Sequence, residues 1–292
     1  MIERVEELKD GVTIIVLIYN HAPYIERCLR SIASQQGVSN LKVLLADDAS
    51  TDGTSDLIRT FVKDDPRFVH LLRSPNLGVA KNSLEARKLL DTKYYMLVDG
   101  DDYFCDDQKV ALQLEALERH PECSFCAHRT RICGKDGEEL GIMGACEGEV
   151  RVFGFEDAPP THPTARLYRH PLSIGADFYY DFLTEHEVFC WDMPLQYAFL
   201  DRAPMVFLNR VMSVYHYNGK GIFSSLSAER QRRGSCRAAY NVDLYTGFRH
   251  TDFFRRMYMP EAGWKRRSLA FRLFGREFEF RLSRRKVKVD GR

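Results

Sequence analysis

A short, almost unbroken run of branched apolar residues near the start of the chain constrains its fold most. Residues 12–19 read VTIIVLIY, and a run of this kind is typical of a strand buried on both faces of a parallel sheet. Apolar residues at helical spacing follow over 24–34, and Pro23 suits the first turn of a helix there. The chain is therefore expected to open with a buried strand and a helix that packs on the sheet.

Strand and helix patterns continue to alternate through the first hundred residues. Strands are expected at 43–46, 68–72 and 94–98, and helices at 54–63 and from the Gly78 turn through Leu90. This alternation predicts βαβ units and a mostly parallel sheet, which binds ligands at the carboxyl ends of its strands. The predicted fold class is therefore α/β, with a Rossmann-like central sheet flanked by helices.

The pattern weakens beyond residue 120. A strand is expected near 123–132, an irregular stretch to about 175, a helix near 192–201 and strands near 205–217. From Ser227 onward arginines become dense, which indicates a basic extension.

Composition and charge exclude some functional classes. The 292 residues include 42 Lys or Arg and 41 Asp or Glu, so a net charge of +1 gives no indication of a nucleic-acid binder. No stretch is long and apolar enough to span a membrane, and the acidic N-terminus does not resemble a signal peptide, so a cytoplasmic protein is expected.

The eight cysteines are expected to be reduced thiols in such a protein. A zinc site is the less favoured alternative, because no Gly or Pro makes a tight turn between the first two of the clustered cysteines. The cysteines of that alternative are Cys123, Cys126, Cys133 and Cys146.

A polar turn, DDASTDGT, begins at Asp47 where the second strand ends. A carboxylate at this place, Asp48, can accept a hydrogen bond from a ring N–H of a nucleobase, while nearby backbone groups meet the ribose. The alternative is turn and helix N-cap chemistry, which explains residues 52–54 but explains two consecutive aspartates less well.

A second acidic turn follows the fourth strand directly. Its carboxylates, Asp99, Asp101 and Asp102, repel one another unless a cation is shared among them. Hard oxygen ligands suit Mg²⁺ or Mn²⁺ bridging a diphosphate, whereas the alternative is a solvated acidic turn. The expected position on the same sheet edge as Asp48 favours a ligand site.

Four segments in this order and spacing resemble the family 2 glycosyltransferases: VTIIVLIYNHAPYIERCLRSIASQ, VLLADDASTDGT, NLGVAKNSLEA and YYMLVDGDDYF. The resemblance covers residues 12–130 and implies the GT-A fold. It also implies that Asp48 holds the nucleobase and that Tyr19 lies against it. Asp99 and Asp101 would engage the ribose, the diphosphate and a Mn²⁺ or Mg²⁺ cofactor. Lys81 stands where many relatives have the arginine of the nucleotide site, which weakens a bidentate phosphate contact.

The resemblance resumes after an unmatched middle, where Asp192 opens a helix at the position of the family's catalytic base. Relatives often have Glu-Asp here, whereas this chain has Trp191-Asp192, with Glu185 and Glu187 a few residues upstream as alternative bases. A first-turn carboxylate that only stabilises the helix is the structural alternative for Asp192.

The segment after the last expected strand resembles the family's diphosphate-binding loop. The matching residues are His216, Lys220, Ser224 and Ser225. His216 is a candidate metal ligand, and an ordinary core or surface histidine is its alternative. The segment THPTARLYRH, with His162 and Arg169, resembles the acceptor-side lining of relatives.

The resemblance implies an inverting, metal-dependent hexosyltransferase that uses a nucleoside-diphosphate sugar, with UDP expected, and a glycan or lipid-linked hydroxyl acceptor in surface polysaccharide synthesis. A sugar nucleotidyltransferase and a catalytically silent sugar-nucleotide-binding module are the alternatives. Against the nucleotidyltransferase, no Gly-rich phosphate loop follows the first strand.

Two domains are expected. The first, 1–226, is divided into a nucleotide-sugar half (12–130) and an acceptor half (131–226), and the second is a basic helical extension at 227–292.

Residues 261–292 contain eleven Lys or Arg and four acidic residues. Phe271, Phe274, Phe278 and Leu282 fall at helical spacing, and one hypothesis is peripheral contact of this segment with the inner face of an anionic membrane. The alternatives are packing on the catalytic domain and a strand, since 277–282 alternates.

Overall fold

The computed structural model describes residues 4–176, 182, 192–219, 221 and 225–258, and the backbone of 269–273, 276–280 and 289–291. The chain divides into two compact units, Met1–Arg249 and His250–Arg292.

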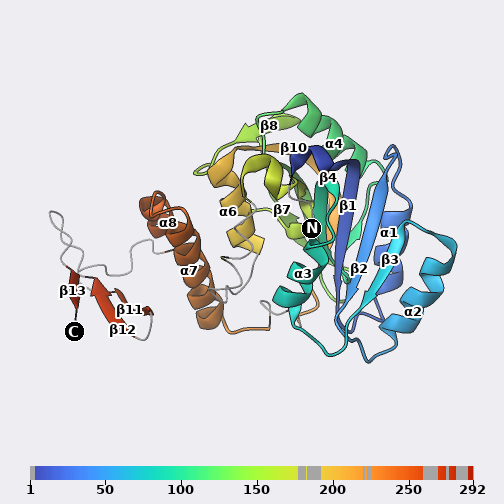
Figure 1. Ribbon diagram of the computed structural model, residues 1–292, viewed down its shortest axis with the longest axis horizontal. Coiled ribbons are helices and arrows are strands. Elements are labelled where there is room, and N and C mark those ends of the chain that lie inside the picture. Colours follow the sequence, from blue (N-terminus) through green and yellow to red (C-terminus); the bar gives the residue numbers. More distant parts are fainter. Residues whose placement is uncertain are drawn as a thin grey trace. The chain divides into compact units, whose positions relative to one another are not determined.

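A ten-stranded sheet forms the centre of the first unit, with strands in the order β3-β2-β1-β4-β9-β6-β10-β5, while β7 pairs with β6 and β8 with β10. Its first four strands are mutually parallel, as the alternating pattern predicts, and β1 lies between β2 and β4 (Figure 1). They are β1 (Lys9–Ile18), β2 (Leu41–Asp47), β3 (Phe68–Leu72) and β4 (Thr92–Asp99). The helices between them are α1 (Ile25–Ala33), α2 (Thr54–Phe61) and α3 (Val79–Arg87). A 3-10 turn, η1 (Val5–Glu7), precedes β1, and another, η2 (Val62–Asp64), follows α2.

Strand β1 is buried on both faces, which is why its sequence shows no polar alternation. One face of β1, including Ile14 and Val16, joins a hydrophobic core with buried residues of α1, α2 and α4 (Lys109–Arg119). The other face carries the equally buried Ile15 and contacts α3. Helix α1 buries the four residues whose spacing predicts it, namely Ile25, Cys28, Leu29 and Ile32.

The second half of the sheet is mixed. Strand β6 (Phe125–Cys133) runs parallel to β10 (Met205–His216), and the short β9 (Leu167–Arg169) lies antiparallel between β4 and β6. The expected irregular stretch before 175 is therefore wrong, because it contains short strands and two 3-10 turns. These elements are β7 (Glu139–Met143), β8 (Val150–Phe153), η3 (Pro163–Ala165) and η4 (Pro171–Ile174).

Helix α6 (Asp192–Arg202) begins where the sequence predicts a helix, and β10 is one long strand that pairs near its end with β5 (Tyr103–Phe104). Helix α7 (Ala228–Tyr245) contacts α6 within the first unit. Across the part of the chain that the structure describes, no helix combines the length and hydropathy needed to cross a bilayer.

The second unit contains α8 (Thr251–Tyr258) and an antiparallel sheet of β11 (Leu269–Leu273), β12 (Arg276–Phe280) and β13 (Val289–Gly291). The extension is thus helical through α7 and α8, whereas the described backbone around Phe271 and Phe278 is strand, as the alternation at 277–282 predicts. Phe274 and Leu282 lie outside the described residues.

Candidate active site

The two acidic turns meet at one edge of the sheet, on either side of the end of β1. Ile18 is paired with Asp47 at the end of β2, and Leu17 is paired with Asp99 at the end of β4. Tyr19 follows β1 directly and is 49% exposed. This confirms the expectation that both acidic turns lie at the carboxyl edge of the sheet.

Two neighbouring carbonyl groups of β1 hold these turns. The N–H of Asp48 donates to the carbonyl oxygen of Ile18, and the N–H of Gly100 donates to that of Leu17, both at 2.9 Å. The first residue of each acidic turn beyond its strand is therefore fixed to the central strand by the main chain.

Asp48 is buried and firmly oriented. Its two carboxylate oxygens accept hydrogen bonds from the main-chain N–H groups of Leu77 (2.7 Å) and Gly78 (2.8 Å), and its carbonyl accepts one from Asn76 Nδ2 (2.7 Å). Each carboxylate oxygen has a second lone pair, so Asp48 can still accept an N–H from a ligand. Lys81 lies exposed in the first turn of the helix that begins after this loop.

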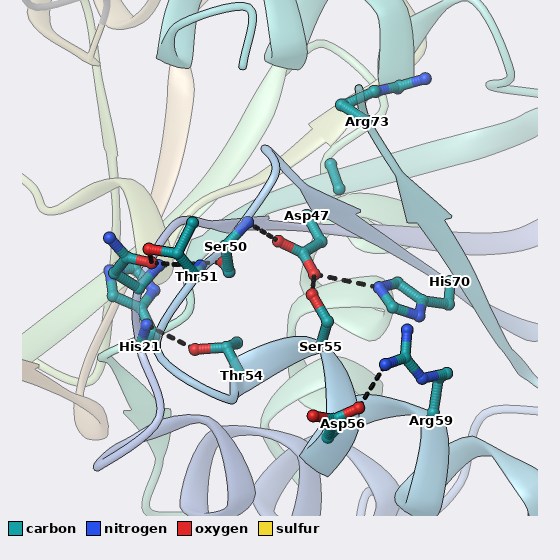
Figure 2. Close-up of polar contacts among 12 residues, drawn as sticks. His21, Asp47, Ser50, Thr51, Thr54, Ser55, Asp56, Arg59, His70 and Arg73 are labelled. Atoms are coloured by element: carbon teal, nitrogen blue, oxygen red, sulfur yellow. Dashed lines mark hydrogen bonds and ion pairs between the residues drawn. The ribbon is translucent and has the colours of Figure 1, made fainter. Parts of the chain in front are cut away.

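Asp47, by contrast, is surrounded by donors from the protein (Figure 2). Its carboxylate is in contact with His70 Nε2 at 3.2 Å and accepts hydrogen bonds from Ser50 N at 3.1 Å and from the Ser55 hydroxyl. Burial alone would raise the pKa of Asp47, but these hydrogen bonds outweigh it and lower the pKa to about 2. Asp47 therefore anchors the turn as a carboxylate that is ionised at neutral pH.

The rest of the acidic turn after β2 is hydrogen-bonded to the loop that follows β1. Asn20 N donates to Ser50 Oγ, and His21 N donates to Thr54 Oγ1, both at 2.9 Å, as Figure 2 shows for the latter pair. Thr54 N in turn donates to Asp52 Oδ1 at 3.1 Å. Residues 52–54 thus have the turn role that the alternative interpretation assigns to them.

Gly100 is required by a close approach of His21. A Cβ atom on residue 100 would lie 2.6 Å from His21 Nδ1, a distance that real Cβ contacts do not show. Burial lowers the pKa of His21, although Asp101, Asp52 and Asp47 act in the opposite direction. The glycine of the second acidic turn therefore makes room for a largely buried, neutral imidazole.

The second acidic turn is held by segments from the far half of the sheet. Asp102 is 1% exposed, and its carboxylate accepts hydrogen bonds from the Thr164 hydroxyl (2.7 Å) and from His216 N at the end of β10 (3.0 Å). Asp101 accepts one from Asn218 Nδ2 at 3.1 Å. Residues that are more than sixty positions away from this turn in the sequence therefore hold its carboxylates.

The carboxylates of this turn repel one another. Burial, Asp101 and Asp192 raise the pKa of Asp99 to about 7. Burial, Asp101 and Asp99 raise the pKa of Asp102 well above its usual range. A divalent cation bound among these groups would remove the repulsion that raises both pKa values.

Ligand atoms of Asp99, Asp102 and His162 lie within 4.8 Å of one another. His162 Nδ1 is 3.4 Å from an oxygen of Asp102, and its ring stacks on Tyr215 with 4.3 Å between centroids. Burial, assisted by Arg166, lowers the pKa of His162 to about 3, so the imidazole is neutral and can coordinate a metal. The family resemblance placed His162 on the acceptor side, and the sequence counted Asp102 among the three crowded carboxylates but named only Asp99 and Asp101 as metal ligands.

His216 reaches the same region mainly through its main chain. Its ring packs against Tyr24 with 4.7 Å between centroids, and its Nδ1 is buried with no hydrogen-bond partner among the described residues. The expected metal set of Asp99, Asp101 and His216 therefore stays a prediction beside the set that the structure brings together.

The structure describes only part of the expected diphosphate-binding loop and base region. Ser225 is exposed, and its N–H donates to the carbonyl of Gly221 at 3.0 Å. The residues that lie outside the described part are Lys220, Ser224, Glu185, Glu187 and Trp191.

Asp192 is the first residue of α6 and is exposed. It is close enough to Asp99 to contribute to the raised pKa of that group. Its main-chain oxygen accepts a hydrogen bond from Arg166 Nη1 at 2.5 Å. Asp192 therefore occupies the first turn of α6 and also contributes to the electrostatics of the acidic site.

Arg169, Cys123 and Cys126 lie away from this edge, whereas Cys133 ends β6 and is paired with His216 at the end of β10. Arg169 donates to the carbonyls of Leu117 (2.7 Å) and Cys123 (2.8 Å), at the amino end of β6 and thus at the opposite edge of the sheet from Asp99. Among the described residues, Cys123 is grouped with His120 and Glu122 rather than with the other cysteines of the zinc alternative.

Comparison with known proteins identifies relatives of this chain. The model of glycosyl transferase family 2 matches residues 13–173. An uncharacterised protein of Mycobacterium tuberculosis is 36% identical over 126 residues, which is 43% of this chain and 36% of that protein. TuaG of Bacillus subtilis, provisionally named as a teichuronic acid biosynthesis glycosyltransferase, is 30% identical over 132 residues, 45% of this chain and 51% of TuaG. The chain thus spans about a third to a half of the length of these relatives.

Solved structures share the fold at low sequence identity. TarS 1–349 of S. aureus, in complex with UDP-GlcNAc, has a TM-score of 0.63 and 16% identity, covering 87% of this chain and 75% of that one. The mannosyltransferase PcManGT of Pyrobaculum calidifontis, in complex with GDP-Man and Mn²⁺, has a TM-score of 0.59 and 15% identity, covering 89% and 76%. The expected GT-A architecture is thereby confirmed. Because the family model matches more than half of its length, this chain belongs to the family 2 glycosyltransferases.

Proposed function

We propose that this protein is an inverting, metal-dependent glycosyltransferase that moves a sugar from a nucleoside-diphosphate sugar to a hydroxyl of a glycan or lipid-linked acceptor in surface polysaccharide synthesis. One observation carries the proposal. The backbone-held carboxylate of Asp48 and the crowded carboxylates of Asp99, Asp101 and Asp102 lie on either side of the same strand.

The nucleobase is assigned to the Asp48 side. The free lone pairs of Asp48 suit a ring N–H, and the exposed Tyr19 ring offers a stacking surface. Uracil and guanine both present such an N–H, and the two similar structures contain UDP-GlcNAc and GDP-Man. We take UDP as the first choice, with Lys81 at the edge of the nucleotide site.

The residues of the second acidic turn fit a hard divalent cation. Carboxylate oxygens with one neutral imidazole suit Mn²⁺ or Mg²⁺, and the raised pKa values of Asp99 and Asp102 mark an excess of uncompensated negative charge. Asp99 and Asp101 would hold the ion, with His162 or His216 as a nitrogen ligand. A bound ion would supply positive charge to the diphosphate oxygens.

The chain's own residues then account for the transfer step. The acceptor oxygen bonds to the anomeric carbon as the bond from that carbon to the diphosphate oxygen breaks, and the electron pair leaves with the nucleoside diphosphate. Asp192 accepts the proton of the acceptor hydroxyl. A single in-line displacement inverts the anomeric centre. Ser225, Lys220 and Ser224 are proposed to contact the diphosphate.

The basic segment 261–292 is proposed to bring the enzyme to an anionic membrane surface and a lipid-linked acceptor. Each basic residue near such a surface contributes about 1 kcal/mol. Co-sedimentation with phosphatidylserine vesicles, comparing the full chain with a truncation after Pro260, tests this. Equal partitioning of the two folded proteins would rule out the membrane role.

The proposed reaction is tested by its products. UDP-glucose, UDP-GlcNAc and GDP-mannose are each incubated with the protein and Mn²⁺, and released nucleoside diphosphate is measured against released pyrophosphate. Nucleoside diphosphate is expected, whereas pyrophosphate would indicate a nucleotidyltransferase. Binding without turnover of any donor would indicate the silent module.

Asp192→Asn tests the base with the best donor of that panel. The amide keeps nearly the same shape but cannot accept the proton, so turnover is expected to fall by about 10² to 10⁴ while donor affinity is kept. If this variant keeps more than about a tenth of the wild-type rate, the base lies elsewhere, with Glu185 and Glu187 as the next candidates.

A further inference from the structure

A buried arginine joins the segment before β9 to the first turn of α6. Arg166 is 2% exposed, and its Nη1 donates to the main-chain oxygen of Asp192 at 2.5 Å and to Tyr168 Oη at 3.2 Å. Its Nε donates to Thr161 Oγ1 at 2.8 Å, and its Nη2 donates to the carbonyl oxygen of Thr161. All three nitrogens of the guanidinium are therefore committed to fixed acceptors.

A second link connects the same segment to α6. The Thr161 hydroxyl accepts the bond from Arg166 and donates to Gln196 Oε1 at 2.9 Å, while Gln196 Nε2 donates to the carbonyl of Pro159 at 3.2 Å. Gln196 is four residues after Asp192 and lies on the same face of the helix. Two successive turns of α6 are thus tied to one network that includes Arg166 and Thr161.

The same segment also contacts the acidic cluster. Thr164, two residues before Arg166, donates from its hydroxyl to Asp102. One short stretch around η3 therefore holds the acidic turn after β4 through Thr164 and the start of α6 through Arg166. The distance between the two parts of the site is fixed by this stretch.

Helix stability alone does not account for Arg166. A cation beside the first turn of a helix opposes the helix dipole, which favours negative charge there. Burial of a charge is also costly without a counter-ion, and no ion pair of Arg166 with a carboxylate is present among the described residues. The planar guanidinium supplies several N–H donors in a fixed arrangement, and these donors fix the positions of Thr161 and Asp192 relative to each other.

We propose that Arg166 is a positioning residue for the transfer step, which places the Asp192 carboxylate at the correct distance from the Asp99 end of β4. This inference rests on the proposed function, in which Asp192 is the base. A misplacement of about 1 Å at a reacting group can cost on the order of 10² in rate. The effect of losing Arg166 is therefore expected in kcat and not in donor binding.

The experiment compares Arg166→Met and Arg166→Lys with the matched control Arg169→Met. Arg169 also donates to main-chain carbonyls from a partly buried guanidinium, but at the opposite edge of the sheet. Initial rates with Mn²⁺ and the best donor of the panel give kcat and donor KM, and urea unfolding gives the loss of stability of each variant.

Both Arg166 variants are expected to lower kcat by about 10- to 100-fold with donor KM within about threefold, because lysine keeps the charge but loses the fork. Arg169→Met is expected to lose stability with kcat nearly unchanged. If Arg166→Met lowers kcat no more than Arg169→Met does, or if Arg166→Lys retains full kcat, the positioning role is excluded.

A double-mutant cycle with Asp192→Asn separates positioning from general loosening of the fold. If Arg166 acts through Asp192, Arg166→Met has no further effect on kcat in the Asp192→Asn background. A full additional loss there would overturn the inference. Should Asp192→Asn alone remain active, the base assignment of the proposed function fails instead, so the two failures are distinguishable.

Thr161→Val provides a milder variant if Arg166→Met does not fold. It removes the hydroxyl that joins Arg166 to Gln196 and keeps nearly the same side-chain shape. A decrease in kcat of about tenfold with unchanged donor KM supports the inference, and an unchanged kcat contradicts it.

Discussion

The ends of β2 and β4 carry the same kind of side chain in opposite electrostatic states. At β2, burial would raise the pKa of Asp47, but hydrogen bonds from His70, Ser55 and Ser50 lower it to about 2. At β4, burial and neighbouring carboxylates raise the pKa of Asp99 to about 7. The two aspartates lie on either side of the same strand.

The difference separates a structural carboxylate from one suited to a ligand. The chain itself supplies every donor that Asp47 needs, so this group stabilises the turn that carries Asp48. The β4 turn instead collects further negative charge from Asp101 and Asp102. Strongly perturbed groups that lack compensation are typical of functional sites.

The largest effect is expected for Asp101→Ala. Removal of a metal ligand leaves the diphosphate charge poorly compensated, so turnover is expected to fall by about 10³-fold or more, a loss of several kcal/mol of transition-state stabilisation. The variant should still fold in EDTA, because the lost carboxylate adds to the repulsion in this turn. Near-normal activity of this variant after chelation would show that the metal lies elsewhere.

Asp47→Asn is expected to act on the fold. The amide can accept only part of the bonds that Ser50, Ser55 and His70 direct at the carboxylate, so the free energy of unfolding is expected to fall by about 2 to 3 kcal/mol. Asp56→Asn is the control in urea unfolding, because Asp56 forms an exposed pair with Arg59 (Figure 2). Equal stability of the two variants would contradict the anchoring role of Asp47.

The two aspartates should also give opposite pH dependences in EDTA. The lowered pKa of Asp47 contributes stability above about pH 4, which is lost as the pH falls toward 2. The raised pKa of Asp99 contributes stability below about pH 4, which is lost as the pH rises through 7. Urea unfolding from pH 2 to 8 measures both. Asp99→Asn should reduce the loss on the neutral side, to which Asp102 also contributes, and leave the loss on the acid side unchanged.

The same pH series is repeated with Mn²⁺ in place of EDTA. A cation among the carboxylates should stabilise the protein most near neutral pH, where those groups are ionised. A neutral-side decline that is the same with and without Mn²⁺ would argue against a metal at the β4 turn.

The smallest effect is expected for His70→Leu. His70 is one of several donors to Asp47, so its loss is expected to cost about 1 kcal/mol in urea unfolding and to leave kcat unchanged. His70→Gln, which restores an N–H donor, should recover part of this loss. A loss as large as that of Asp47→Asn would mean that His70 alone holds the turn.

The nucleotide-side half of the fold could be predicted because its signals are local. The apolar run at 12–19 is long enough to identify a doubly buried strand, and each acidic turn directly follows a strand whose end position is then known. The placement of Asp48 and Asp99 at one edge follows from the parallel order of β2, β1 and β4.

In the other half, the longer elements β6, α6 and β10 lie where the sequence predicts them, but the short strands and the non-local contacts could not be predicted. Strand β9 has three residues, too few for a periodic pattern, yet it separates β4 from β6. The partnership of Asp102 with Thr164 and His162 joins positions about sixty residues apart. The only sequence signal for it is the His-Pro-Thr stretch that begins at residue 162.

The attachment of the two turns to adjacent carbonyls of β1 has a consequence for how donor preference can change. The N–H of Gly100 is bonded to the carbonyl of Leu17, and the N–H of Asp48 to the carbonyl of Ile18. One peptide unit of an inner strand therefore sets the distance between the nucleobase end and the phosphate end of the proposed donor site. An inner strand cannot lengthen there without disturbing both of its neighbours. On the proposed function, evolutionary changes of donor are therefore expected in the side chains around the base or the sugar, while the length of the linking phosphate chain stays constant.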